Sequence, residues 1–127
     1  AADALASGEV DGICVGEPWN SVAVDRGVGA ISVVTAQIWR RGVEKVLAMP
    51  TRAMEDNPER TERLLRALYR AGIAFVDPAH QDEIVRILSG PAYVDAPEEP
   101  VRRAVSDRIL FARGHEPHHV PDFMFQH

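Results

Sequence analysis

The stretch Asp11-Gly12-Ile13-Cys14-Val15-Gly16-Glu17-Pro18-Trp19-Asn20 decides how this sequence folds. Its first half is a short apolar segment with glycines, which is typical of a strand buried on both faces. Pro18 then stands where a helix can begin, because the first helical residues need no N–H donor. The sequence therefore predicts a strand that turns at Gly16 into a helix. The N–H groups and positive dipole end of such a helix favour a bound anion.

A purely structural interpretation of this junction stays open. Glycine turns between strands and helices are common, and Trp19 would then anchor the core. Cys14 lies inside the predicted strand and is expected to be a small buried hydrophobe.

Outward from this junction, short apolar runs alternate with amphipathic ones. We predict strands at Val10–Val15, Ala30–Thr35 and Val43–Met49, and helices at residues 3–7, 18–26, 58–76, 81–88 and 95–106. Asn57-Pro58 marks a helix start, with a capping side chain followed by proline at the first position. Gly8 and Gly27 mark helix ends. This order predicts an α/β fold with a mostly parallel sheet.

The composition is that of an ordinary soluble globular protein. The 127 residues carry a net charge of -5, with 46% hydrophobic and 26% charged residues. Acidic and basic residues are mixed, so bulk charge does not favour nucleic acid. The sequence has no apolar run near the roughly 20 residues of a membrane span. It begins without Met inside a predicted helix, so we expect a fragment whose N-terminal half is missing.

Lys45 is the second candidate for anion binding. Alternation along Val43–Met49 places it on the same face as Leu47 and Met49, where an unpartnered charge is costly. A bound anion or the carboxylate of Glu17 would compensate for that charge. A lysine whose ammonium reaches solvent at the strand end is an equally open alternative.

The remaining reactive side chains form no recognisable catalytic or metal-binding pattern. His115, His118, His119 and His127 have no zinc-ligand spacing, and a solvated, irregular tail explains them better. Ser21 has no nucleophile-elbow context. We therefore predict no enzyme activity, no metal and no cofactor.

The opening stretch resembles the D-G-[FY]-C-V-G-E-P-W-N signature of nitrate- and bicarbonate-binding proteins, the substrate-binding components of ABC transporters and related nitrate-sensing regulators. Thr35–Trp39 with Glu44–Leu47 is similar to a second family segment, A-T-x-I-W followed by P-E-K-V-L, although Val43 replaces its proline. The Asn57-Pro58 helix start matches too, as does Tyr93-Val94 before Ala96-Pro97. The resemblance covers nearly the whole chain.

The resemblance implies a type II periplasmic-binding-protein-like fold, in which two α/β lobes close on a ligand. This chain would be its C-terminal part. Residues 1–42 would end the second lobe and cross over, and residues 43–127 would return to the first. The missing N-terminal half would supply an aromatic residue, a glutamine and a histidine to the pocket.

The resemblance also implies the ligand. Positions matching Gly16 and Lys45 hold nitrate in the family, and bicarbonate-binding relatives have an acidic residue and calcium in place of the lysine. We therefore predict nitrate or nitrite binding by Gly16, Lys45, Glu17 and Trp19, without a metal. A lysine and N–H donors suit a monovalent anion.

Two functions of different class share that predicted pocket. One is a periplasmic or membrane-anchored receptor that delivers nitrate to an ABC permease. The other is a cytoplasmic nitrate sensor that controls an RNA-binding antiterminator partner. Bicarbonate binding and a domain without ligand are further alternatives. Apolar surface left by the missing half also predicts association of the fragment with itself.

Overall fold

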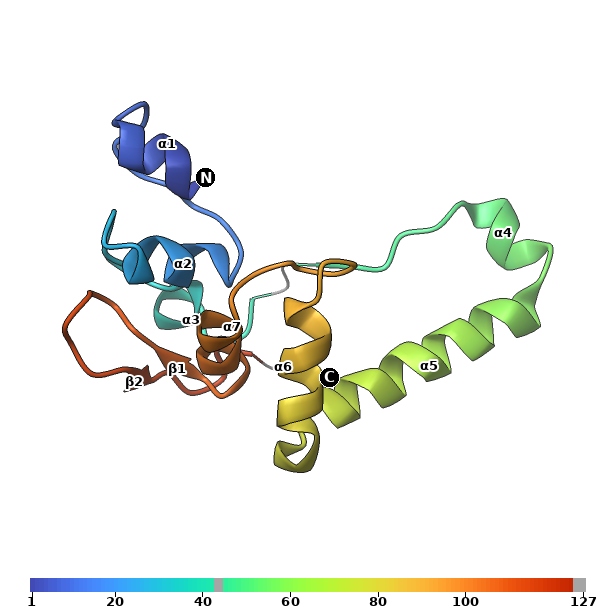
Figure 1. Ribbon diagram of the computed structural model, residues 1–127. Coiled ribbons are helices and arrows are strands. Elements are labelled where there is room, and N and C mark those ends of the chain that lie inside the picture. Colours follow the sequence, from blue (N-terminus) through green and yellow to red (C-terminus); the bar gives the residue numbers. More distant parts are fainter. Residues whose placement is uncertain (43–44, 125–127) are drawn as a thin grey trace.

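The computed structural model describes residues 1–42 and 45–124 (Figure 1). Its elements in chain order are α1 (Ala2–Ser7), α2 (Trp19–Asp25), α3 (Thr35–Ile38), α4 (Thr51–Glu55), α5 (Pro58–Val76), the 3-10 helix η1 (Pro78–His80), α6 (Gln81–Ser89), α7 (Glu98–Val105), β1 (Arg108–Ile109) and β2 (His118–His119). None of the helices among these residues is long and apolar enough to cross a membrane.

The helix boundaries follow the predicted capping residues. The Asn57 side chain accepts a hydrogen bond from the Arg60 N–H at 2.9 Å, which satisfies one of the free donors at the start of α5. Gly8 ends α1 with φ 73°, and Gly27 follows α2 with φ 70°. These are left-handed conformations that favour glycine. The predicted helices are confirmed to within a few residues. The short helix that Thr51 was expected to begin is also confirmed as α4, and α3 is added.

Most of the helices and the small sheet form one body, which we define as α1–α3 together with α6, α7, β1 and β2. Its first core cluster contains Val34, Ile109 and Val120, and its second contains Val85, Ala96 and Val101. The sheet is an antiparallel pair in which Ile109 lies opposite His118. The first cluster therefore joins residues near position 34 to the hairpin formed by β1 and β2.

Helix α7 connects the early and late parts of this body. Its nearly buried Arg103 donates two hydrogen bonds to the Asp25 carboxylate of α2, at 2.7 and 2.8 Å. The Ile31 N–H also donates to the Phe111 carbonyl at 2.8 Å. These contacts cross the predicted boundary between residues 42 and 43, and the assignment of the two parts to two lobes stays a prediction.

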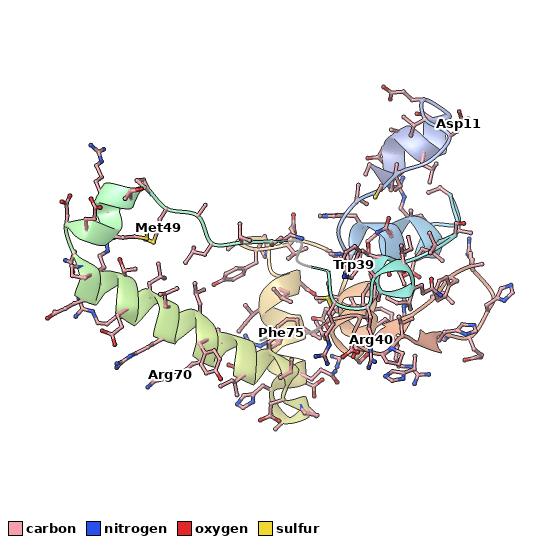
Figure 2. All side chains as sticks on the ribbon, turned by 180° about the vertical axis from the view of Figure 1, so that it is seen from behind. Asp11, Trp39, Arg40, Met49, Arg70 and Phe75 are labelled. Atoms are coloured by element: carbon pink, nitrogen blue, oxygen red, sulfur yellow. The ribbon has the colours of Figure 1, made fainter. Side chains whose placement is uncertain are left out.

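Residues 45–76, containing α4 and α5, project from the body as an arm (Figure 1). The main contacts of α5 are with α4, η1 and α6. Figure 2 shows Phe75 where α5 meets α6, and Arg70 further out along the arm. No residue of α4 or α5 is buried.

The three predicted strands are wrong as local structure. Val10–Val15 and Ala30–Val34 have no regular secondary structure, Thr35 begins α3, and Lys45–Met49 is likewise irregular. The first two positions of the predicted third strand, 43 and 44, lie outside the described residues. A strand requires a neighbour for its N–H and C=O groups. Among the described residues, these segments make one backbone hydrogen bond to a distant segment, from the Ile31 N–H to the Phe111 carbonyl, and this single bond forms no ladder.

Two predictions about burial fail for the same reason. Cys14 is exposed instead of buried. Val46 and Leu47 are both exposed, at 76% and 51%, so the segment after Lys45 has no buried face. These segments are apolar in sequence, but the described residues do not bury Cys14, Val46 or Leu47.

Candidate functional site

The turn between Val15 and α2 is held by a side chain that the sequence interpretation did not assign. Asn20 donates a hydrogen bond from Nδ2 to the Val15 carbonyl at 2.6 Å. The Trp19 N–H donates to the Gly16 carbonyl at 3.2 Å, which closes the turn itself. Asn20 therefore fixes the direction in which the chain enters the helix. Its place at the end of the family signature was the available signal.

The carboxylate of Glu17 lies against the first turn of α2. Its Oε2 accepts a hydrogen bond from the Ser21 N–H at 3.3 Å, while its Oε1 is buried with no hydrogen-bond partner in the described structure. A carboxylate is the anion that a helix N-terminus favours. The helix start is thus not open to an external anion as the sequence suggested, because Glu17 already lies there.

A cavity of about 820 Å³ opens beside this turn. Its walls are Leu5, residues 11–17, Asn20, Ala23, Val24, residues 28–36, Phe123 and Met124. Gly16 is exposed there, and its N–H makes no hydrogen bond within residues 1–42 and 45–124. The structure therefore brings Gly16, Glu17 and Asn20 to one concave surface with a backbone donor available.

The other two predicted ligand-binding residues do not line this cavity. Lys45 is exposed on the arm, and Trp19 is 42% exposed at the first residue of α2. The interpretation of Trp19 as a core anchor is therefore wrong. Lys45 is the only lysine of the sequence, so no other ammonium side chain of this chain can take its role.

The histidines contribute to structure in the described residues. His118 lies in β2, and its ring meets that of Phe111 edge to face, with centroids 5.7 Å apart. His119 lies opposite Arg108 in the sheet. His118 and His119 therefore belong to a β-hairpin, whereas the sequence predicted an irregular tail. Across the described positions, no three His, Cys, Asp or Glu side chains gather as a metal site would require.

Comparison with known proteins adds to this geometry. Residues 1–89 match the model of the NMT1-like family. This chain belongs to that family. The crystal structure of the periplasmic nitrate-binding protein NrtA from Synechocystis PCC 6803 superposes with a TM-score of 0.89 and 26% identity, covering 97% of this chain and 32% of that one. The match confirms the predicted type II periplasmic-binding-protein fold and the resemblance to nitrate-binding proteins.

Relatives by sequence include both nitrate and bicarbonate proteins. The nitrate/nitrite binding protein NrtA of Synechococcus elongatus is 32% identical over 110 residues, which are 87% of this chain and 25% of that protein. The bicarbonate transport ATP-binding protein CmpC of the same species is 32% identical over 115 residues, 91% of this chain and 17% of that protein. The chain thus spans about a quarter or less of these relatives, which are binding proteins and transporter components.

Proposed function

We propose that this chain contributes one wall of a small-anion site, with nitrate as the ligand, in the substrate-binding component of an ABC-type transporter. The observation that carries the proposal is the close superposition on the nitrate-binding protein NrtA. Because that protein is described as periplasmic, we place this chain in the periplasm or outside the cell. The permease of the same transporter would receive the anion.

The available groups suit a weakly basic monovalent anion. The Gly16 N–H is the donor, and its missing side chain lets the anion approach the backbone. Lys45 supplies the positive charge once the site closes. Glu17 holds the turn through Ser21 and does not touch the anion, since two like charges in contact would repel. Trp19 contributes apolar surface at the rim.

Bicarbonate is the second candidate, because CmpC is as similar to this chain as NrtA of the same species. The family resemblance implies an acidic residue with calcium at the Lys45 position of bicarbonate sites. A lysine there would repel calcium, so we place nitrate ahead of bicarbonate.

Calorimetric titration with nitrate, nitrite and bicarbonate tests the ligand. We expect nitrate to bind, Lys45→Glu to weaken it at least about thirtyfold, and Lys45→Ala to weaken it less. Arg108→Ala, which removes an exposed cation on β1, is the control and should leave affinity unchanged. If nitrate affinity is unchanged in Lys45→Glu, Lys45 does not contact the anion. If bicarbonate binds and nitrate does not, the ligand is bicarbonate.

The single lysine permits an independent measurement. Amine acetylation followed by mass spectrometry modifies only Lys45 and the chain terminus. We expect saturating nitrate to slow acetylation of Lys45 while the terminal amine reacts at an unchanged rate. Equal protection by chloride at the same ionic strength would indicate screening instead of binding.

A further inference from the structure

The walls of the cavity beside Gly16 carry acidic side chains and no basic one. Among the described residues that form these walls, the titratable side chains are those of Asp11, Cys14 and Glu17, and none is Lys, Arg or His. A thiol is ordinarily uncharged at pH 7, whereas the carboxyl groups of Asp and Glu ordinarily carry a negative charge. An anion that enters this cavity therefore meets negative charge of its own sign.

The two carboxyl groups differ in their access to water. Asp11 is exposed, and Figure 2 shows it beside α1, at the outer end of this part of the molecule. Glu17 is only partly exposed, and its Oε1 is buried without a hydrogen-bond partner in the described part of the chain. A buried oxygen without a donor is an unfavourable place for a negative charge. A proton on Oε1 would replace that charge with an O–H donor.

Ser21 offers a partner for such a proton. It is fully buried, at 0% exposed, and its Oγ likewise has no hydrogen-bond partner within residues 1–42 and 45–124. The Ser21 N–H already donates to Oε2 of Glu17, so the two unsatisfied oxygens belong to residues that are hydrogen-bonded to each other. A hydroxyl oxygen accepts hydrogen bonds as well as donating them. An O–H on Glu17 that donates to Ser21 Oγ would satisfy both atoms.

The other charged groups around α2 are engaged in ion pairs of their own. Asp25 of α2 pairs with Arg103 of α7, which also contacts Glu99. Arg26, the residue after α2, pairs with Asp3 of α1. Helices α1 and α7 are the main elements that contact α2, and none of these five side chains lines the cavity. The negative charge at the cavity wall is therefore not offset from the elements that pack against α2.

We propose that Glu17 takes up a proton when the anion binds, and that Ser21 Oγ accepts the resulting O–H. The site then binds nitrate together with a proton, and this inference rests on the proposed function. Without the proton, Asp11, Glu17 and the anion would bring three negative charges, of which Lys45 offsets one. The proton comes from the solvent, and no bond of the anion changes. Because coupling between two ligands is reciprocal, nitrate binds more tightly as the pH falls.

Calorimetric titration with nitrate at constant ionic strength, in two buffers of different ionisation enthalpy at the same pH, counts the protons taken up. We expect uptake of at most one proton per anion, and an affinity at least about fivefold higher at pH 5 than at pH 8. Glu17→Gln imitates the protonated carboxyl, so it should abolish the uptake and keep the affinity nearly constant with pH. Ser21→Ala should reduce the uptake because the O–H loses its acceptor. Asp11→Asn, on the same wall, is the control and should leave the proton count unchanged.

Four results would count against these assignments, each against a different part. A heat of nitrate binding that is the same in both buffers would overturn the proton coupling and leave nitrate binding intact. Uptake that persists in Glu17→Gln would assign the proton to another group and overturn the proposal. Undiminished uptake in Ser21→Ala would overturn Ser21 Oγ as the acceptor. The absence of any heat with nitrate would overturn the proposed function, and the coupling with it.

Discussion

The body and the arm differ in what stabilises their helices. In the body, Val85 and Ile109 are fully buried and Arg103 bridges α7 to α2. In the arm, α5 is the longest helix described and has the best capping residues, yet none of its residues is buried. Local signals are therefore sufficient to define a helix, but burial must come from tertiary partners. The arm therefore presents a long helix with several exposed large apolar side chains and no buried residue.

Truncation of one apolar side chain in each region should show the largest contrast. Ile109→Ala removes a side chain with 0% exposure and should lower the free energy of unfolding by about 3 kcal/mol. Leu68→Ala removes one that is 47% exposed, and should change it by about 0.5 kcal/mol or less. Urea unfolding followed by circular dichroism measures both. Equal losses would show that the arm is covered in solution, as it would be in a self-associated chain.

Two of the ion pairs of α7 show the same contrast between a buried and an exposed contact. Arg103 is nearly buried against Asp25, whereas the neighbouring Arg102 pairs with the exposed Asp82. Asp25→Ala leaves a buried guanidinium poorly compensated, and we expect a loss of about 2 kcal/mol because Asp25 is partly exposed. Asp82→Ala should leave the unfolding midpoint nearly unchanged. A similar effect of both variants would mean that α7 does not depend on its contact with α2.

The sequence predicted the helices well because their signals are local. Asn57 and Gly8 act through their own backbone neighbours, so no other part of the fold was needed to interpret them. The strands were predicted from the composition of short segments, and strand pairing depends on distant segments that such composition does not identify. Cys14 is an example, because its place in an apolar segment predicted burial and the residue is exposed.

The sequence predicted a set of site residues, and the structure brings only some of them to one cavity. Gly16 and Glu17 were found from the signature, and both line the cavity. The carboxylate of Glu17 accepts a hydrogen bond from the Ser21 N–H in the first turn of α2. That contact depends on how a short turn folds, which the spacing does not reveal. Lys45 and Gly16 lie on separate elements, and only a tertiary arrangement decides how near they come.

Glu17→Ala would sharpen the distinction between a capping and a ligand-binding carboxylate. Loss of the hydrogen bond to the Ser21 N–H should cost about 1 kcal/mol of unfolding free energy. Nitrate affinity should stay the same or rise slightly, because a nearby negative charge is removed. The exposed Glu9→Ala is the matched control and should change neither quantity. A large loss of nitrate affinity with unchanged stability would mean that Glu17 contacts the ligand directly.

The smallest change in stability is expected from a substitution at Asp122, which contacts the segment that leads from the body to the arm. The Asp122 carboxylate accepts hydrogen bonds from Arg40 at 2.5 Å and Arg41 at 3.1 Å, and these bonds lower the pKa of Asp122 below its ordinary value. A carboxyl with a lowered folded pKa stabilises the fold above its ordinary pKa, near 3.9, and loses that contribution as pH falls toward the folded pKa.

Asp122→Asn should therefore reduce stability slightly at pH 7, and its difference from the unsubstituted protein should shrink as the pH is lowered below about 4. Thermal unfolding between pH 3 and pH 7 measures this difference. Asp11→Asn, at an exposed position with no ion pair among the described residues, is the control. A difference that stays constant across this range would mean that the arginines contact Asp122 without depending on its charge, and the junction would then be held by packing of Phe123 on the first core cluster.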